Sequence, residues 1–513
     1  MTKKLISIIC AAMMLISAVG CSEDDKQIST ESSDLSSTVS EVTDTATSQS
    51  SVSSDVEEKP SSEASATEAS TQPKESSEPL PQETTASSAT TLATEATTAA
   101  TTTAKTTAST ANSTTAKTTA VTTEKTTVVT TAKTTTSATT VATTTTPATT
   151  AKVDEPVISE EDDISDLTTM EIVRDMGVGI NLGNTYESFG DWLIQWGDGT
   201  VESYETAWSS PVITEKMIKG YADAGFGVLR VPVAWSNLMG DNYTVSAEYI
   251  DAVKEVVDWA LKYDMYVIIN LHYDSGWLDN FPTDKKNCMK KYKRIWEQVS
   301  DAFKDYNEKL MFESQNEELG WISVWDYYSS STKGKAESYA LVNEINQTFV
   351  DIIRSSGGKN DTRHLLISGY NTDIDRTCDS LFEMPDDPAD RCAVSVHYYT
   401  PYPFTLMEKD EVWAKVRSTW GTAADMQELE YYMDKVKTAF VDKGVPVIIG
   451  EYGCMTQNRD PASVRLFLSS VCEEAYTRGI CPVLWSVTGE HYDRDTCKII
   501  DPQLAEFYKN IVD

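Results

Sequence analysis

Leu310-Met311-Phe312-Glu313-Ser314-Gln315-Asn316-Glu317-Glu318 is the stretch that decides the fold. It begins as a short apolar run, the pattern of a buried strand, and then becomes polar. A strand that presents Asn316 and Glu317 at its C-terminal end is typical of a barrel, in which strand ends deliver catalytic side chains to the mouth. The stretch therefore predicts a barrel strand with Glu317 at its active end.

A second stretch, Val445-Pro446-Val447-Ile448-Ile449-Gly450-Glu451-Tyr452-Gly453, has the same pattern. Here too an apolar run ends in one carboxylate, Glu451. A single Glu of this kind is better interpreted as a solvated residue at a strand end. Two of them, each closing a buried run among aromatic residues and histidines, favour a catalytic pair.

Apolar runs alternate with helical patterns over residues 166–513, which predicts βα units and a parallel sheet. The expected strands are Gly177–Leu182, Val228–Pro232, Met265–Leu271, Leu310–Phe312, His364–Ser368, Ala393–His397, Pro446–Gly450 and Pro482–Ser486. The expected helices are Thr214–Ala224, Ala247–Lys262, Asn287–Asp305, Ala336–Ser356, Asp425–Lys443 and Ala462–Thr477, with Thr214 and Ser246 as N-caps. A doubly wound sheet shares this alternation, but eight units favour a closed α/β fold, the (β/α)8 TIM barrel.

The N-terminal third of the 513 residues has a different composition. All 46 aromatic residues (12 Trp, 23 Tyr and 11 Phe) lie at Tyr186 or later. A segment without aromatic residues cannot bury much core. We therefore expect residues 22–165 to be a disordered linker rich in Ser, Thr and Ala, and residues 166–513 to be the catalytic domain.

Residues 1–21 have the pattern of a signal peptide. Lys3 and Lys4 precede an apolar run, which ends at Gly20-Cys21 and resembles a bacterial lipobox. This predicts a lipoprotein-type signal, lipidation of Cys21, and a secreted protein tethered to the bacterial cell surface. Ordinary cleavage after Gly20 is the alternative. Membrane contact is expected only through this lipid anchor.

The net charge of −36 argues against nucleic acid as a partner, because phosphate binding needs clustered Lys and Arg. It also argues against an anionic polysaccharide and is compatible with a neutral polymer. The nine Cys form no CxxC pair, so a zinc site is not expected. Cys454 and Cys481 adjoin apolar runs and are expected to be small buried side chains.

Polar and aromatic side chains follow seven of the eight expected strands. They are Asn181, Asn184 and Tyr186; Arg230 and Trp235; Asn270, His272, Tyr273, Asp274 and Trp277; Asn316, Glu317 and Glu318; His397, Tyr398 and Tyr399; Glu451; and Trp485. The C-terminal strand ends of a barrel meet at one face. A lone His is more often a satisfied core residue, but two of the four His in the chain, His272 and His397, lie at these ends.

Two carboxylates at one mouth suit glycoside hydrolysis, which needs an acid for the leaving oxygen and a second carboxylate on the opposite face. Tryptophans offer flat apolar surfaces to sugar rings. A metal cluster of Glu and His is the competing use of these residues. We predict no metal, because His272 and His397 lie on different strands without metal-ligand spacing.

These residues resemble glycoside hydrolase family 5, the cellulase-type retaining β-glycanases, over the whole globular part. Phe312-Glu313-x-x-Asn316-Glu317 resembles the acid/base motif of the family, and Ile449-Gly450-Glu451-Tyr452-Gly453 its nucleophile motif. Leu229-Arg230-Val231-Pro232 is similar to its strand-two Arg segment, and Gly179-Ile180-Asn181-Leu182-Gly183-Asn184 to the opening of its endoglucanases. His272, His397, Tyr399 and Trp485 also stand where the family places these residue types.

The resemblance implies a role for each residue. Glu451 would attack the anomeric carbon, and Glu317 would protonate the departing oxygen and then activate a water. Arg230 would hold Glu451 ionised, and Tyr399 would help to position it. The residues expected to bind or support the substrate are Arg230, His272, Asn316, His397, Tyr399, Trp485, Asn184 and Trp277. No cofactor is needed.

Two positions depart from the family pattern. Glu318 stands in place of the usual Pro, and Tyr273 in place of a second His. Glu318 would add a negative charge beside Glu317 and favour its protonated form. An exposed loop carboxylate is the equal alternative for Glu318.

The sequence therefore predicts a monomeric, secreted, retaining endo-β-1,4-glucanase that acts on a β-glucan polysaccharide. Xyloglucan, mixed-linkage β-glucan and β-mannan remain alternative substrates. The rival from another class is a non-catalytic glycan-binding surface protein, which would have no need of both Glu317 and Glu451.

A truncated protein that begins at Glu155 should fold and should keep full activity on soluble polymer, because residues 22–152 have no aromatic residue with which to build a core. Circular dichroism and reducing-sugar release would compare it with the full chain. Lost folding or a large fall in activity would reveal a domain in the N-terminal third.

Overall fold

The computed structural model of the protein describes residues 164–512. The expected signal peptide, Cys21, and residues 22–163 of the expected linker lie outside the described residues, so those predictions stay predictions. Among residues 164–512, no helix combines the length and the apolar character that crossing a membrane requires.

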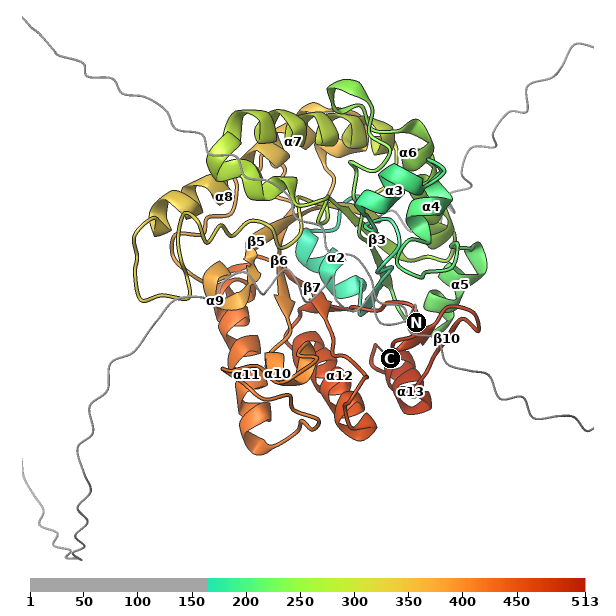
Figure 1. Ribbon diagram of the computed structural model, residues 1–513, viewed down its shortest axis with the longest axis vertical. Helices are drawn as coiled ribbons and strands as arrows, with labels where there is room; N and C mark the ends of the chain where they lie inside the picture. The colour runs from blue at the N-terminus through green and yellow to red at the C-terminus, as the bar shows by residue number, and fades with distance from the viewer. Residues whose placement is uncertain (1–163, 513) are drawn as a thin grey trace, which may run out of the picture. The chain divides into compact units, whose positions relative to one another are not determined.

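Eight parallel strands close into a barrel in chain order, which confirms the predicted fold (Figure 1). The strands are β1 (Gly179–Asn181), β2 (Val228–Val231), β3 (Tyr266–Asn270), β4 (Leu310–Glu313), β5 (Leu365–Asp373), β6 (Cys392–Tyr398), β7 (Val447–Tyr452) and β8 (Cys481–Leu484). Each lies at one of the eight predicted positions. Their nearly continuous burial is typical of parallel strands that are covered on both faces.

The six predicted helices are present outside the strands. They are α5 (Glu215–Asp223), α6 (Ala247–Lys262), α7 (Phe281–Phe303), α8 (Lys335–Ser355), α11 (Ala423–Ala439) and α12 (Pro461–Tyr476). In α6 the buried face includes Tyr249, Val253 and Val256, as its helical period predicts. Thr214 and Ser246 occupy the predicted N-cap positions, and their side chains make no capping hydrogen bond.

Several short elements carry no strong periodic signal and were not predicted. They are α2 (Thr169–Asp175), α3 (Asp191–Trp196), α4 (Val201–Glu205), α9 (Ile374–Thr377), α10 (Tyr402–Thr405), α13 (Pro502–Asn510), the strands β9 (Tyr492–Asp493) and β10 (Lys498–Ile499), and the 3-10 turns η1 (Asp241–Tyr243), η2 (Trp277–Asn280), η3 (Gly358–Asp361) and η4 (Val441–Lys443). Most of them lie in the loops that follow the strands.

Helix α2 packs its apolar side chains into the barrel. Ile172, Val173 and Met176 form one buried cluster with strand residues such as Val228 and Met311. A capping box starts this helix, in which Thr168 and Glu171 bond to each other's backbone N–H. Figure 1 shows α2 at the centre of the ring of strands. Apolar side chains thus fill the barrel interior near the N-terminal ends of the strands, whereas polar side chains lie near their C-terminal ends.

One glycine adjusts the register at the end of β7. Val396 pairs with Ile449 and His397 pairs with Glu451, so Gly450 is an extra residue in β7. A Cβ at Gly450 would lie 3.0 Å from Ser395 Oγ and 3.1 Å from His397 Nε2, so a side chain does not fit easily. Such a bulge re-aims the residue that follows it, which here is Glu451.

All seven cysteines among the described residues are free. Cys454 and Cys481 are buried, as predicted.

Candidate active site

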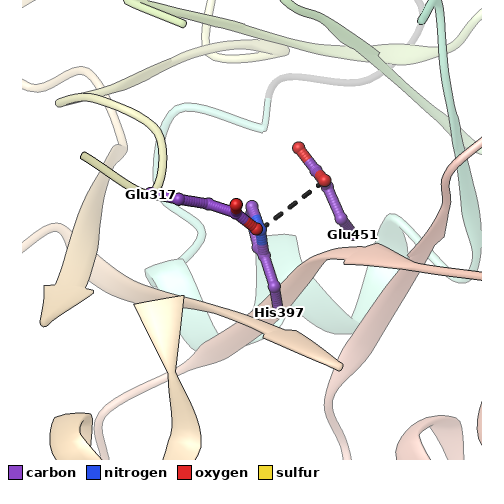
Figure 2. A group of neighbouring side chains, drawn as sticks. All are labelled: Glu317, His397 and Glu451. Carbon is purple, nitrogen blue, oxygen red and sulfur yellow. Dashed lines mark hydrogen bonds and ion pairs between the residues drawn. The ribbon is translucent and has the colours of Figure 1, made fainter. Parts of the chain in front are cut away.

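Glu317 follows β4, and it converges with His397 near the end of β6 and with Glu451 near the end of β7 (Figure 2). His397 Nδ1 lies 2.7 Å from Glu317 Oε1 and 3.6 Å from Glu451 Oε2. One oxygen of each carboxylate and one ring nitrogen of His397 all lie within 4.8 Å of one another. The structure therefore brings the two carboxylates that the sequence singles out to one point.

The guanidinium of Arg230 fixes one member of this group, Glu451. Its side chain is fully buried at the end of β2. Nη1 donates to Glu451 Oε1 at 2.7 Å, and Nε donates to Glu313 Oε2 at 2.7 Å. Nη2 donates to Asn316 Oδ1 at 2.9 Å. One guanidinium thus orients a carboxylate on β7 and an amide after β4.

Glu451 is buried and doubly hydrogen-bonded. Tyr399 Oη donates to its Oε2 at 3.0 Å, while Arg230 holds its Oε1. Burial raises the pKa of Glu451, with the charge of Glu317 adding to the rise, whereas the cations His397 and Arg230 oppose it. The cations and the hydrogen bonds favour the ionised form against that burial.

His397 is the second cation of the group. Burial alone would lower its pKa, but the charges of Glu451 and Glu317 and the hydrogen bond with Glu317 raise it above the usual value. His397 therefore tends to carry a proton between two carboxylates. It can stabilise either of them as an anion.

The two carboxylates differ in their access to solvent. The side chain of Glu317 is 37% exposed, whereas that of Glu451 is 7% exposed. Glu317 is thus the carboxylate that can exchange protons with water and with a departing group. Glu451 is the more buried carboxylate, and Arg230 and Tyr399 fix its two oxygens.

His272 and Trp485 form a flat wall. Their rings are stacked, with centroids 5.9 Å apart and planes 6° from parallel. Burial, with the charges of Arg230 and His397, holds the pKa of His272 well below its usual range, so this ring is neutral. Asn270 Nδ2 lies 3.2 Å from its Nδ1, which places the proton on Nε2. That N–H can donate to a sugar hydroxyl.

Asn184 lies in the loop after β1 with a φ of 58°. Its carbonyl oxygen accepts from Ser210 Oγ at 2.5 Å, and its N–H donates to Glu187. A Cβ at the preceding Gly183 would lie 3.1 Å from the Trp485 ring, so this loop packs against Trp485. Asn184 is therefore held beside the flat wall through its backbone.

Trp277 contacts residues of its own loop and of α7 rather than the two carboxylates. Its indole N–H donates to Asp274 Oδ2 at 2.8 Å, and Lys291 Nζ lies 4.5 Å from its ring centroid. Its ring also packs at 6.2 Å from Phe281. These contacts hold Trp277 within the loop after β3, and none of them joins it to the two carboxylates.

Tyr273 and Glu318, the two departures from the family pattern, both have raised pKa values. Burial raises the pKa of Tyr273, and the charges of Asp279 and Glu318 add to it. Burial, then the charges of Glu317 and Asp279, also raises the pKa of Glu318 well above its usual range. Its Oε2 is buried and has no hydrogen-bond partner among the described residues. This pKa shift favours the neutral form of Glu318, whose side chain is half-buried rather than exposed. The negative charge expected beside Glu317 stays a prediction.

Glu313, Asn181 and Ser395 complete the group and were missed as site residues. Glu313 is fully buried and accepts from Arg230 and, at 2.7 Å, from Ser395 Oγ. Asn181 Oδ1 accepts from Arg230 Nη1 at 3.0 Å, and its Nδ2 donates to the Gly450 carbonyl at 2.9 Å. The signal for Glu313 was available, because a charge within an apolar strand needs a buried partner.

Glu317, His397 and Glu451 are also the group of side chains among residues 164–512 that could hold a metal ion. The donor set fits a metal poorly. Both oxygens of Glu451 already accept hydrogen bonds, and the Arg230 cation lies 2.7 Å from one of them. A metal cation at this place would be repelled by Arg230. A pair of carboxylates that exchange protons explains the same arrangement without that repulsion.

The family model "Cellulase (glycosyl hydrolase family 5)" matches residues 191–491. The chain belongs to glycoside hydrolase family 5. The match spans the loops and strands that bring Arg230, Glu317, His397 and Glu451 together.

Curated members of the family are similar over the barrel. A xyloglucan-specific endo-beta-1,4-glucanase of Bacteroides ovatus is 35% identical over 314 residues, which cover 58% of this chain and 59% of that enzyme. Endoglucanase A of Ruminococcus albus is 32% identical over 353 residues, which cover 66% of this chain and 92% of the relative. The chain thus spans less than two thirds of the length of the Bacteroides enzyme.

Solved structures of family 5 proteins are also similar to this chain. A broad-specificity endoglucanase from an uncultured bovine rumen ciliate has a TM-score of 0.61 and 36% identity, covering 67% of this chain and 98% of that one. A lichenase from Caldicellulosiruptor, solved with cellotetraose, has a TM-score of 0.59 and 32% identity, covering 68% and 96%.

Replacing Tyr399 by Phe should move the acidic limb of the pH profile of kcat/KM to higher pH. The hydroxyl donates to ionised Glu451, so its loss disfavours the anion and raises the pKa of that carboxyl. One charge-assisted hydrogen bond is also worth about 10–100-fold in rate. Initial rates on a soluble glucan from pH 4 to pH 8 would measure both effects.

Tyr398→Phe is the matched control, because Tyr398 is the neighbouring residue but packs against Tyr432 and Phe467. Its pH profile should not change. An acidic limb that stays in place for Tyr399→Phe would contradict the role of the Tyr399 hydroxyl.

Proposed function

We propose that this family 5 protein hydrolyses internal β-1,4 bonds of β-glucans and retains the configuration of the anomeric carbon. The observation that carries the proposal is the spacing of Glu317 and Glu451, in which one oxygen of each lies within 4.8 Å of the other. Retaining glycosidases hold their two carboxyl groups about 5–5.5 Å apart, whereas inverting ones leave roughly 6.5–9.5 Å for a water.

In the first step, Glu451 attacks the anomeric carbon and forms a glycosyl–enzyme ester. Arg230 and Tyr399 supply the hydrogen bonds that orient its two oxygens. The carbon–oxygen bond to the leaving sugar breaks as the new bond forms, and Glu317 gives its proton to that oxygen. Glu317 is partly exposed, so a water can reach it and return a proton to it in the second step.

In the second step, Glu317 takes a proton from a water, and that water displaces Glu451. His397 lies against both carboxylates and can support the negative charge as it moves between them. Burial of His397 and Glu451 strengthens these interactions, because a water-poor site screens charge weakly.

The remaining polar groups suit the sugar at the cleaved bond. Asn316 Oδ1 accepts from Arg230, and Nδ2, which also donates to Glu318, has a second N–H for a sugar hydroxyl such as the 2-OH. The flat face of Trp485, backed by neutral His272, suits the apolar face of a pyranose ring.

The substrate class follows from the relatives together with the charge. Relatives are described as a xyloglucan-specific endo-beta-1,4-glucanase, a broad-specificity endoglucanase and a lichenase. The substrates of such enzymes share a neutral backbone with β-1,4 glucosyl bonds. A neutral polymer is compatible with the net charge of −36 of this protein. Carboxymethyl cellulose, xyloglucan, barley β-glucan, glucomannan and xylan form the panel that would rank the candidates.

The initial product of the wild-type enzyme should have the β-configuration at its new reducing end, because two inversions restore the starting configuration. Proton NMR of cellopentaose cleavage, recorded before mutarotation, would show it. An initial α-product would rule out Glu451 as the nucleophile.

Glu451→Gln should lower kcat on the order of 10⁴-fold while leaving binding largely intact, because its role lies in the transition state. Glu451→Gly with added azide should form an α-glycosyl azide, since a small anion can enter the vacated space. Glu318→Gln is a matched control, because Glu318 favours the neutral form and is not part of the carboxylate pair. A non-catalytic glycan binder would bind insoluble cellulose and release no reducing sugar.

We also propose that the protein is exported and tethered to the bacterial surface through Cys21. The support is the apolar run that ends at Gly20-Cys21, followed by the long Ser/Thr-rich segment. Cys21→Ser should move the protein from the membrane fraction to the medium or block its processing. Unchanged partition on immunoblots would point to ordinary cleavage after Gly20.

A further inference from the structure

Arg459 is a buried cation in the loop that follows β7, with 6% of the residue exposed. Its Nε donates to the carbonyl oxygen of Phe404, and its Nη2 donates to that of Met407 at 2.6 Å. Within residues 164–512 its side-chain hydrogen bonds all go to backbone carbonyl oxygens, the third being that of Gln457, and none goes to a carboxylate. Burying a cation without a carboxylate is costly, so Arg459 is stable there only while these carbonyl oxygens stay around it.

The carbonyls that Arg459 binds belong to α10 and to the turn that follows it, in the loop after β6. Thr405 is the last residue of α10 and is fully buried. Its hydroxyl donates to the carbonyl oxygen of Tyr399 at 2.5 Å, and its own carbonyl oxygen accepts from the N–H of Met455 at 2.8 Å. The loop after β7 thus holds α10 at two points, and α10 in turn holds the backbone of Tyr399.

Tyr399 depends on such support because it lies just beyond the paired part of its strand. Strand β6 pairs with β7 as far as Tyr398 and Tyr452, one residue before Tyr399. The Tyr399 hydroxyl donates to Glu451 Oε2 at 3.0 Å, and a hydrogen bond weakens steeply as its donor moves or tilts. The strength of this bond is therefore set by the loop that carries Tyr399 and not by the sheet.

We infer that Arg459 is a positioning residue, which acts through α10 to hold the Tyr399 hydroxyl against Glu451. The contacts form a closed circuit. It runs from Glu451 along the loop after β7 to Arg459, crosses to α10, and returns through Tyr399 to Glu451. Arg459 bonds to neither carboxylate of the pair within residues 164–512, so its role is geometric. The inference rests on the proposed function, in which Glu451 is the nucleophile.

Arg459→Met should move the acidic limb of the pH profile of kcat/KM to higher pH, in the same direction as Tyr399→Phe. When α10 loosens, the Tyr399 hydroxyl moves away from Glu451, which disfavours the carboxylate anion. We expect kcat/KM to fall about fivefold, the effect of one weakened hydrogen bond. In a Tyr399→Phe background, Arg459→Met should cause no further shift, because the hydroxyl through which it acts is gone. Initial rates of the full chain on a soluble β-glucan, over the pH range used for Tyr399→Phe, would measure these profiles.

Thr405→Val tests the next contact of the circuit and nearly keeps the shape of the side chain. It removes the hydroxyl that bonds to the Tyr399 carbonyl, so the acidic limb should move to higher pH here too. Thr405→Ser keeps a hydroxyl and should leave the limb in place. If Arg459→Met does not fold, this pair of variants decides: a shift in Thr405→Val alone supports the inference, and no shift overturns it.

Arg363→Met is the matched control. Arg363 is also buried and also donates to backbone carbonyl oxygens, those of Leu310 at 2.7 Å and Phe303 at 2.9 Å. It precedes β5, however, and so lies at the opposite end of the barrel from the two carboxylates. Its loss should lower the melting temperature and leave the acidic limb in place. Thermal unfolding of each variant would thus separate lost stability from a displaced hydroxyl.

An acidic limb that stays in place in folded Arg459→Met and in Thr405→Val would overturn the inference. A further shift in the Tyr399→Phe background would also overturn it, because Arg459 would then act on Glu451 by another route.

The pKa of Glu451 can also be measured without turnover, by carbon-13 NMR of the chain labelled at the glutamate side-chain carboxyl carbon. Glu451→Gln would assign its signal. A wild-type protein that cleaves no β-glucan would refute the proposed function, whereas a raised pKa of Glu451 in Arg459→Met would still support the positioning role. An active wild type with an unchanged pKa of Glu451 in the variants would refute the positioning role alone.

Discussion

The buried guanidinium of Arg230 is the constraint on which the site depends. It joins groups from β1, β4 and β7 through Asn181, Glu313 and Glu451. Removing ions from water costs several kcal/mol each, so such a cluster is stable only when every partner is in place. The barrel supplies those partners from strands that are far apart in the chain. The fold and the charge arrangement therefore require each other.

This arrangement gives two chemically equal carboxyl groups different environments. Glu451 lies in the buried part of the cluster, where Arg230 and His397 oppose the rise that burial causes in its pKa. Glu317 lies at the edge, is more exposed, and contacts His397 through one oxygen. The difference in environment, rather than in residue type, suits one group to attack and the other to transfer protons.

The surroundings of this pair carry the features that distinguish this chain from the family pattern. Glu318 and Tyr273 depart from the family pattern, and burial, with the charges of Asp279 and Glu318, raises the pKa of Tyr273. The loops that follow the strands are free to vary in length and sequence, because the barrel does not depend on them. Substrate preference is thus separable from the chemistry of the cleaved bond.

The sequence by itself determined the barrel, because each strand is a short apolar run with a long amphipathic helix after most of them. It also predicted that Glu317 and Glu451 form a pair, because each follows such a run. Glu313 and Ser395 escaped notice, and Asn181 was given no role in the site, because their importance lies in contacts between strands that no local pattern records. Only the tertiary structure decided that one carboxylate oxygen of Glu318 is buried and that Trp277 contacts Lys291. Burial and pairing depend on chain segments that meet only when the barrel closes.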